Sequence, residues 1–600
     1  MKISARLLVI EFAALLLFVV AASVGFLAWR LSQGPIDLEF IRPRIERSLA
    51  EARGGLPVRI DRLALEWSRD RSQVEAAAHG VTAFDRNGQS VSRAERAVIT
   101  LNAAALVSGK LQTERLRIEN GRASVLRNRD GVWSLAGVVF LREPVSAAKP
   151  FDPLRDLNWT TLATPIRALV SAGSFERIEL VNFSLDVTDE GAGSAWSANP
   201  VNAAWSATGE GVALSLDARL LAAGEPNSIR IALSADGEVS RATGRLTLEG
   251  VDPLTVAGMF GYAGQAFVSH SPADAAFTVE ASEANGLTKA LLNLSGVTGR
   301  GNAGGVDFAI EDLAFDAAYD PATRLVSLNT LNIRSDRLTG AFSGTMDASQ
   351  FVGREGSQPI AFKLSGRDFT VAATPVFEQP WSFASGEIEA SISPDLLKLT
   401  VAELKAVTGG LSANARGDIW FDGPPEARQI GMKLRATGSG AVTPAQLIAF
   451  WPVRLGADGR IWVRDHILAG TATRADLTID WPPGANAAGF LPDEHLTLDF
   501  EVADASVSFL SDFPPVTGVK GVGRMRGNSL SMDLTGGTMK TWQVDDGKVV
   551  LPRFHPGGAT MEVTATGRGE LRELMRVLDA SNLNIGEKYG LSVELSLIHI

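Results

Sequence analysis

The stretch LTLDFEV, residues 496–502, decides the fold class. Every second residue in it is apolar and the residues between are polar: Leu496, Leu498, Phe500 and Val502 alternate with Thr497, Asp499 and Glu501. Successive side chains of a β-strand point to opposite faces of its sheet. The stretch therefore predicts a strand with one apolar and one solvated face, as in antiparallel sheets.

The same period of two recurs along the chain from Val58 onward, most regularly in residues 212–220, 477–481, 530–534 and 591–597. Turn signals separate such stretches: Asp236-Gly237, Asp320-Pro321, Asp458-Gly459 and Asp546-Gly547. One strand changes phase at Asn329-Thr330, which predicts a β-bulge there. The chain is expected to be mainly β, built from many antiparallel hairpins.

Helical patterns are few. Residues 35–53 predict an amphipathic helix whose first turn is at Pro43, and residues 157–172 and 571–578 predict two more. Asp252-Pro253 and Thr443-Pro444 each resemble an N-cap followed by proline. So few helices cannot cover all the apolar strand faces. Sheet against sheet, closed barrels, or one long curved sheet remain as arrangements, and periodicity alone does not choose among them.

An apolar run near the amino terminus predicts a membrane anchor. LLVIEFAALLLFVVAASVGFLAW, residues 7–29, contains a single charge and is 23 residues long, enough to cross about 30 Å of hydrocarbon. Lys2 and Arg6 precede it and favour a cytoplasmic amino terminus. The alternative is a signal peptide cleaved near Ala21-Ala22-Ser23. Both interpretations place the rest of the chain outside the cytoplasm, as in a bacterial periplasm.

The composition excludes several classes of function. The chain has no cysteine, which rules out thiolate metal sites, iron–sulfur clusters and cysteine nucleophiles. With 57 basic and 68 acidic residues the formal net charge is −11, which argues against a nucleic-acid partner. The six histidines are scattered along the chain. The composition points away from catalysis.

No motif predicts a catalytic, cofactor or metal site. GVKGVGRMRG, residues 518–527, lacks the spacing of a dinucleotide fingerprint and predicts a turn-rich hairpin. The acidic pairs at Asp545-Asp546 and Glu311-Asp312 are expected to be turn or solvated-face residues, and His466 a turn or packing residue. Three tryptophans lie in stretches with strand-like patterns, which predicts core packing for them: Trp133, Trp462 and Trp481.

Three stretches carry a family resemblance. RIENGRASVLRNRDGVWSLAG, residues 117–137, resembles the amino-terminal unit of AsmA-like envelope proteins. Residues 451–480 and residues 509–537, the latter with Phe513-Pro514-Pro515-Val516, resemble the YhdP-like branch. The resemblance implies a long repeating β-groove, like that of bridge-like lipid transporters, that moves phospholipid between the inner and outer membranes. It brings no catalytic residues.

The expected fold is an amino-terminal transmembrane helix followed by a long, curved antiparallel β-sheet with a few short amphipathic helices. We expect an anchor at residues 1–30, an AsmA-like unit at 31–143, a loop and helix at 144–175, and a groove region at 176–600. Members of this branch are usually longer, and the final alternating residues end without a polar cap. We therefore expect the sequence to be a piece of a longer protein.

The expected function is to shield phospholipid acyl chains between the two membranes of the envelope, without enzymatic activity or a cofactor. The expected partners are phospholipids, the inner membrane and membrane proteins of the envelope. The alternatives are an envelope scaffold that acts through protein partners and a β-solenoid enzyme acting on polysaccharide, which would need clustered carboxylates or histidines on one face. The candidate groove lining consists of Leu477, Ile479, Leu498, Phe500, Leu530, Met532, Val563 and Val593.

A reporter enzyme that is active only in the periplasm, fused after Gly55, is expected to be active. The reason is that Lys2 and Arg6 hold the amino terminus in the cytoplasm, so the apolar run carries the residues after it across the membrane. Activity of a cytoplasm-only reporter at the same position would contradict this topology.

Overall fold

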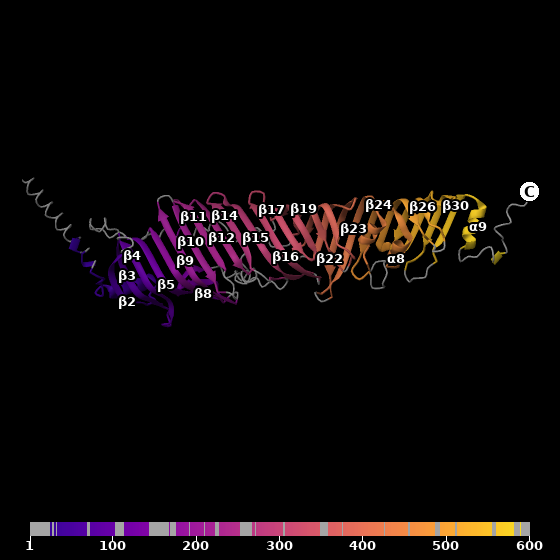
Figure 1. The fold of residues 1–600 in the computed structure, drawn as a ribbon. Coiled ribbons are helices and arrows are strands. Elements are labelled where there is room, and N and C mark those ends of the chain that lie inside the picture. Colours follow the sequence, from indigo (N-terminus) through magenta and orange to yellow (C-terminus); the bar gives the residue numbers. More distant parts are fainter. Residues whose placement is uncertain are drawn as a thin grey trace, which may run out of the picture. The chain divides into compact units, whose positions relative to one another are not determined.

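The computed structural model describes most of the chain after residue 24 (Figure 1). The described residues are 25–26, 29–31, 33–68, 73–101, 113–142, 167, 176–190, 193–208, 211–221, 227–252, 267–269, 272–303, 306–348, 358–374, 376–395, 397–424, 427–453, 457–485, 492–509, 513–554, 560–580 and 588–589. They form two compact units, the first made of residues 1–297 and 318–323 and the second of residues 298–317 and 324–600. Each unit is described by itself.

In the first unit, helix α2 (Arg42–Ala52) lies between two of the strands in sequence. The strands of this unit are β1 (Ile36–Asp37), β2 (Val58–Ser68), β3 (Gln73–Phe84), β4 (Ser90–Leu101), β5 (Thr113–Arg127), β6 (Val132–Leu135), β7 (Val138–Arg142), β8 (Arg177–Asp189), β9 (Ser194–Thr208), β10 (Gly211–Leu220), β11 (Ser228–Asp236), β12 (Arg241–Val251), β13 (Phe267–Ser269) and β14 (Ala273–Ser282). The residues of β15 (Gly286–Ala303) and β16 (Val306–Asp320) are divided between the two units.

The second unit contains the helices α7 (Pro444–Phe450), α8 (Ala457–His466) and α9 (Leu571–Ala580) and the short 3₁₀ turn η2 (Asp493–His495). Its strands are β17 (Leu325–Ser335), β18 (Leu338–Asp347), β19 (Ile360–Val371), β20 (Trp381–Ile392), β21 (Lys398–Thr408), β22 (Leu411–Asp422), β23 (Gln429–Val442), β24 (Ile467–Trp481), β25 (Leu496–Val507), β26 (Val516–Arg526), β27 (Ser529–Thr535), β28 (Thr538–Met539), β29 (Trp542–Leu551) and β30 (Glu562–Arg568).

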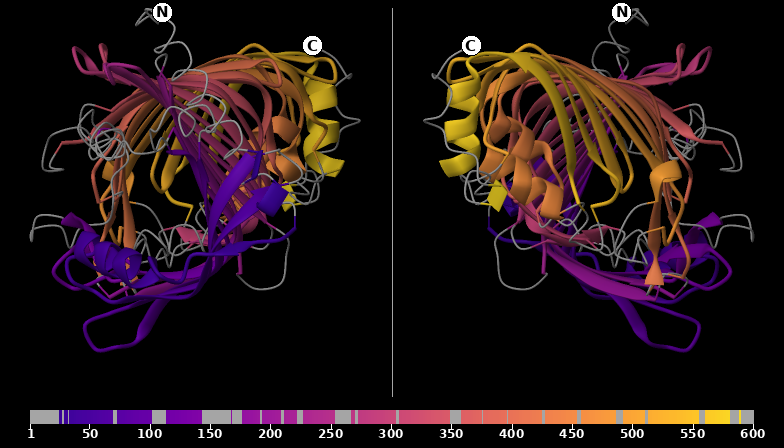
Figure 2. Two further views of the ribbon diagram at one scale, coloured as in Figure 1. Left: turned by 90° about the vertical axis from the view of Figure 1, so that its left-hand side faces the viewer. Right: turned by 90° about the vertical axis from the view of Figure 1, so that its right-hand side faces the viewer.

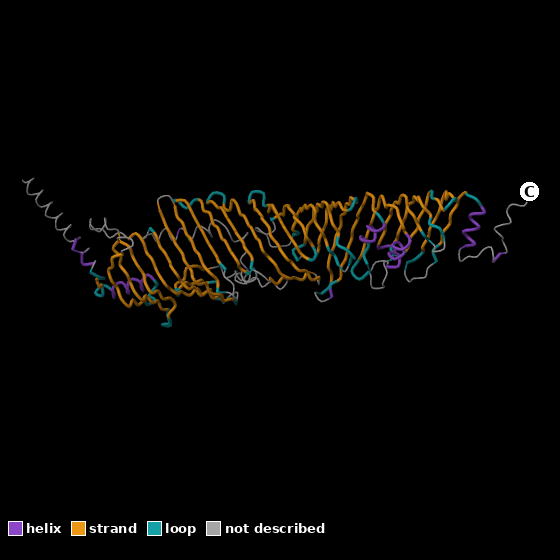
Figure 3. The backbone as a smooth tube through the Cα atoms, in the orientation of Figure 1, coloured by secondary structure: helices purple, strands orange, loops and turns teal. Residues whose placement is uncertain are grey.

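Neighbouring strands of the second unit pair antiparallel from β17 to β27 in chain order, and β29 and β30 follow on. The tube in Figure 3 shows these strands as a row of hairpins with α7 and α8 beside it. The prediction of a mainly β chain with antiparallel hairpins and few helices is confirmed.

The pairing of β5 with β8 departs from the predicted antiparallel pattern. In the first unit β5 pairs with β8 in parallel, from Arg115 opposite Arg177 to Arg127 opposite Asp189. In the sequence, the hairpin β6–β7 and residues 143–176 separate these two strands. This length lets β8 start beside the first residues of β5. Parallel neighbours need such a long connection, whereas antiparallel neighbours need only a tight turn.

Several local predictions are confirmed. Helix α2 carries Pro43 in its first turn, and the N-cap of α7 is Thr443, whose side chain forms a capping box with Gln446. Helix α9 covers the predicted helix at 571–578. The register of β17 against β18 shifts between Leu328 and Leu331, where the bulge was expected. The predicted helices at 157–172 and after Asp252, and the strand at 591–597, lie outside the described residues, apart from Arg167.

Two predicted turns are wrong. Asp458-Gly459 lies inside α8, where Asp458 occupies the first turn and its carboxylate suits the positive end of the helix dipole. The strand pattern at Trp462 is wrong for the same reason, because Trp462 lies in α8, whereas Trp133 and Trp481 lie in β6 and β24. Asp546-Gly547 lies inside β29 beside a register shift, so this glycine accompanies a bulge and not a turn.

Register shifts recur in the strand pairs of the second unit, for example between β20 and β21, β21 and β22, β23 and β24, and β25 and β26. An extra residue on one strand bends that strand and increases its twist. Repeated bulges therefore curve the sheet. Figure 2 shows the strands of the second unit as an arch, with α7 and α8 on its concave side.

In the first unit, the neighbouring strands β5 and β8 each bend at an asparagine, and the two bends lie side by side. Asn120 and Asn182 adopt positive φ angles of 51° and 58° inside β5 and β8. Their side chains are linked, since Asn182 Nδ2 donates to Asn120 Oδ1 over 2.8 Å, and Asn120 Nδ2 donates to Glu95 Oε2 over 2.9 Å. Asparagine tolerates this backbone region better than most residues. The linked side chains hold the bends of neighbouring strands in line.

The apolar faces are only partly buried. Among the described residues, Ile60 alone combines a large side chain with an exposed fraction below 2%. A face-to-face sandwich would bury the inner side chains of both sheets. All the described strands of the second unit belong to one sheet, so they supply no second layer. The single curved sheet is therefore the arrangement that the second unit adopts.

Among the described residues, no helix has both the length and the apolar character needed to cross a membrane. Of the predicted anchor at residues 7–29, only residues 25, 26 and 29 are described. The anchor therefore remains a prediction from the sequence.

We predict that Gly344→Ala destabilises the chain by about 1–3 kcal/mol. A Cβ atom at Gly344 would lie 2.0 Å from the backbone oxygen of Lys363 on the neighbouring strand, and backbone cannot move aside cheaply. The matched control is Gly547→Ala, where the nearest atoms lie 3.5 Å away and alanine should be neutral. Urea unfolding of the full chain, followed by tryptophan fluorescence, measures both. Equal midpoints for the two variants would contradict the close strand approach.

Candidate functional site

Seven of the eight predicted lining residues lie on one face of the second unit. Antiparallel partners share a face, and the register places Leu477, Leu498, Met525 and Leu530 in one row across β24, β25, β26 and β27. The next row contains Phe500, Gly523, Met532, Val549 and Val563. Ile479 lies opposite Leu496 on the same face. The eighth residue, Val593, lies outside the described residues.

This apolar face is half open to solvent. Leu496 and Met525 are buried, with Leu477, Leu498 and Leu530 packed against them. The candidates Leu498, Phe500 and Met532 are half-buried, and Val563 on β30 is 44% exposed. Side chains that are apolar, aligned and still accessible can receive an apolar ligand without unfolding a packed core.

The central residues Leu496, Met525 and Phe554 were not among the predicted lining residues. Leu496 belongs to the alternating stretch at residues 496–502, so its face was available from the sequence. Met525 lies in the glycine-rich run that indicated a hairpin, which is confirmed as β26 and β27. Phe554 follows β29 outside any strand, and no sequence signal connects it with Leu496 and Met525.

A row of small residues crosses six strands of this face. Register pairs place one member on each strand from β19 to β24: Gly366, Gly386, Ala406, Ala413, Gly438 and Ala475. The rings of Phe342 and Phe369 lie over Gly366 and Gly386. From β21 to β24 the members of the row are glycine and alanine, and the Leu411 side chain lies over Gly438.

Aromatic side chains attach α7 to β20. Phe342, Phe369 and Phe383 follow one another at centroid distances of 5.3 and 4.9 Å. Trp381 meets Phe450 of α7 edge-on at 5.4 Å, and its indole Nε1 donates to the carbonyl oxygen of Ala449 over 3.0 Å. These contacts hold α7 against β20.

The opposite face of the second unit is charged and internally neutralised. Ion pairs join neighbouring strands, such as Lys363 with Glu389 at 2.8 Å, Lys433 with Asp480 at 3.1 Å and Arg526 with Asp499 at 2.9 Å. Exposed pairs of this kind add little stability. Their effect is to keep this face in water while the other remains apolar.

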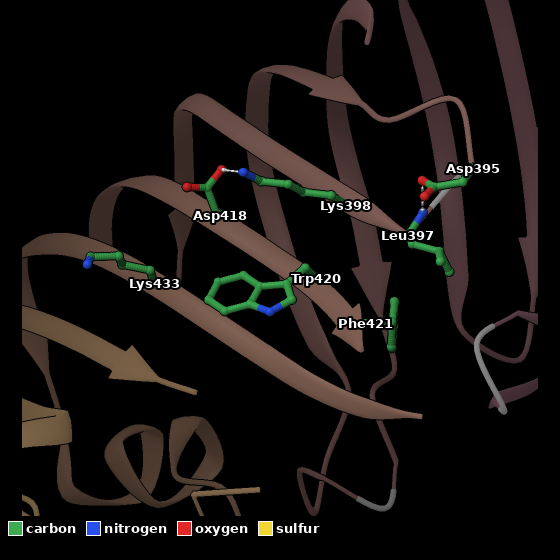
Figure 4. Close-up of a pocket in the computed structure, with 7 residues that line it drawn as sticks. All are labelled: Asp395, Leu397, Lys398, Asp418, Trp420, Phe421 and Lys433. Carbon is green, nitrogen blue, oxygen red and sulfur yellow. Dashed lines mark hydrogen bonds and ion pairs between the residues drawn. The ribbon is translucent and has the colours of Figure 1, made fainter. Parts of the chain in front are cut away.

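A shallow hollow on the charged face holds Trp420 (Figure 4). Trp420 covers Gly431, while Lys398 pairs with Asp418 at 3.4 Å and Asp395 accepts a hydrogen bond from the Leu397 amide at 3.0 Å. Since Lys433 pairs with Asp480, both lysines at the hollow already have carboxylate partners. Nothing in this arrangement selects a ligand.

The described residues contain no group of three or more side chains that could hold a metal ion. The acidic pairs are held by arginines, since Asp545 accepts from Arg568 over 3.0 Å and Glu311 lies 3.3 Å from Arg334. His466 stacks on Trp462 at 5.2 Å, as expected of a packing residue. The face itself is lined by apolar side chains.

The comparison with protein families bears on the unit that carries this face. Residues 326–588 match the family model described as YhdP protein. This stretch of the chain belongs to the YhdP family. It includes the two stretches that resemble the YhdP-like branch, so that prediction is confirmed. The AsmA-like resemblance of residues 117–137 lies outside the match and remains a prediction. No curated protein and no solved structure matches the chain.

The YhdP stretch contains nearly all of β17 and every later helix and strand of the second unit. All seven described lining residues therefore lie within it. Residues 451–480, the first of the two resembling stretches, build α8 and β24.

In the first unit, a charged network joins three strands. Glu66 of β2 lies 2.8 Å from His79 of β3 and 2.9 Å from Arg96 of β4, and Arg96 also reaches Glu75 at 3.3 Å. Partial burial of Glu66 opposes its ionisation, but hydrogen bonds from His79 and Arg96 prevail. The pKa of Glu66 therefore lies below its ordinary value.

A carboxylate with a lowered pKa stabilises the fold above its unfolded pKa, and that contribution disappears as the pH falls through the folded pKa. We predict that Glu66→Gln lowers the free energy of unfolding by about 1 kcal/mol at pH 7. The variant should also lose less stability than the parent between about pH 5 and pH 3. Urea midpoints across this range test the prediction, with the exposed Glu51→Gln on α2 as control. Parallel pH curves for the parent and Glu66→Gln would contradict it.

Proposed function

We propose that this protein shields the acyl chains of phospholipids on the apolar face of its curved sheet during passage between the inner and outer membranes. The apolar run at residues 7–29 anchors it in the inner membrane, and the rest of the chain lies in the periplasm. Membership of residues 326–588 in the YhdP family supports an envelope role.

One observation carries the proposal. The apolar residues of the second unit form continuous rows across neighbouring strands, and these rows are half open and have no second sheet of described strands over them. Large exposed apolar surfaces on proteins mark binding sites for apolar partners. A row that continues from strand to strand suits a long, flexible and apolar ligand better than a compact one.

The physical basis is burial of hydrocarbon. Each acyl CH₂ group removed from water contributes about 0.8 kcal/mol, so a face that covers the chain lowers the cost of leaving a bilayer. The small residues Ala406, Ala413, Gly438 and Ala475 present no bulky side chain of their own to a sliding chain. The charged headgroup stays in water at the open side.

We predict that a photoreactive p-benzoylphenylalanine replacing Leu498 cross-links to phospholipid in cells. Leu498 lies on the apolar face, half-buried between Leu477 and Met525. The matched control is the same amino acid at Asp499, the next residue, which is exposed on the charged face. Mass spectrometry of the cross-linked protein should find lipid at position 498 and little at position 499.

Equal labelling at the two positions would show that lipid contacts the protein non-specifically and would contradict the proposal. Cross-links from position 498 to a protein without any to lipid would favour the scaffold alternative.

A further inference from the structure

Helix α8 reaches both ends of the strands that it crosses. We call the strand ends at residues 409–410, 443 and 508 the helix rim, and those at residues 496, 527–528 and 554 the far rim. At the helix rim, His466 Nδ1 lies 2.5 Å from the carbonyl oxygen of Ser508, and the Ser508 amide donates to the His466 carbonyl over 2.9 Å. At the far rim, a Cβ atom on Gly459 would lie 3.1 Å from the ring of Phe554.

Phe554 belongs to the far rim through backbone hydrogen bonds. Its amide donates to the carbonyl oxygen of Asn528 over 2.7 Å, and the neighbouring Gly527 amide donates to that of Leu496 over 2.8 Å. Leu496 begins β25, whose last residue, Val507, precedes Ser508. The segment of α8 from Gly459 to His466 therefore contacts residues beside both ends of β25.

The lengths show how far the sheet curls here. The 12 residues of β25 have a contour of about 40 Å at 3.3 Å per residue. The helical segment between Gly459 and His466 is only about 10 Å long at 1.5 Å per residue. Strand β25 is therefore much longer than the helical segment that contacts residues beside both of its ends, so the sheet curves around α8, which lies on its concave side in Figure 2. The enclosed side chains include Leu496 and Met525, the buried pair of this face.

Helices α7 and α8 are attached to the sheet in different ways. At the helix rim α7 is held by the Trp381 indole, which donates to the Ala449 carbonyl, and by Gln446 Nε2, which donates to the Gly409 carbonyl over 2.7 Å. In α8, Gly459 and Arg460 are both buried: Gly459 lies against the ring of Phe554, and Arg460 forms an ion pair with Glu378. An opening motion hinged on the contacts of α7 would therefore break both the Gly459–Phe554 contact and the ion pair of Arg460.

The inference that follows rests on the proposed function, because a movable helix over the apolar face matters only if lipid travels along that face. The side chains beneath α8 are apolar, so a phosphate headgroup would have to shed its water there, at a cost of several kcal/mol. We propose that α8 is a strap, hinged at the helix rim, that must lift from Phe554 for a phospholipid headgroup to pass between β17–β23 and β25–β29.

The absence of native cysteines allows a reversible lock. In the double variant Gly459→Cys and Phe554→Cys, oxidation should join α8 to the far rim, and reductant should release it. The full chain is incubated with phosphatidylethanolamine and phosphatidylglycerol vesicles that contain a phospholipid with a diazirine beside its ester carbonyl. Photolabelled peptides then report where the headgroup end of the lipid lies.

In the oxidised protein, labelling of residues 496–535 should fall by about tenfold relative to the reduced protein, because the lock removes the open state. Labelling of residues 381–442 should not change. Equal labelling of residues 496–535 in both states would overturn the strap, and so would failure of the two thiols to join. Absence of labelling in both stretches, oxidised or reduced, would instead contradict the proposed lipid function.

A second variant tests whether weakening the contact between α8 and Phe554 raises the labelling of residues 496–535. Phe554→Ala removes the ring that meets Gly459 and leaves the contacts at the helix rim intact. Labelling of residues 496–535 should rise several-fold, whereas labelling of residues 381–442 should stay as in the parent. A fall in labelling of residues 496–535, with residues 381–442 unchanged, would overturn the strap.

Discussion

An apolar sheet face without a second sheet to cover it is the constraint on which the second unit depends. Backbone hydrogen bonds satisfy each strand within the sheet, but they do nothing to remove the apolar side chains from water. The unit meets this constraint by curving the sheet and by placing α7 and α8 on its concave side. Part of the face, around Leu496 and Met525, becomes buried, and the rest stays accessible.

Curvature in turn depends on local backbone irregularities. Bulges between neighbouring strands bend the sheet of the second unit, and glycines such as Gly344 and Gly523 let backbone or a ring approach closely. In the first unit, positive φ angles at Asn120 and Asn182 have the same local effect, held in line by side-chain hydrogen bonds. A flat sheet with the same alternation would leave its apolar face fully open and prone to aggregate.

The two faces of the second unit differ in the partners that they can contact. Ion pairs such as Lys363 with Glu389 occupy the charges of the outer face. The inner face combines bulky side chains with a row of small residues, which gives hydrocarbon a surface of nearly uniform character. The family match, the apolar rows and the half-open burial support the proposed lipid path, and the proposed strap at α8 would add one place along it where passage is controlled.

The sequence by itself determined the β class, the antiparallel hairpins, the caps of α7 and which residues share the apolar face. These follow from the period of two and from local capping chemistry, which act within a few residues. It did not determine that α8 replaces a predicted turn at Asp458-Gly459, because an Asp-Gly pair suits a turn and a helix start alike. Nor did it show that β5 and β8 run parallel. Only the tertiary structure decided that the sheet curls until Gly459 meets Phe554, since that contact joins residues nearly a hundred positions apart through bends whose sum no local pattern records.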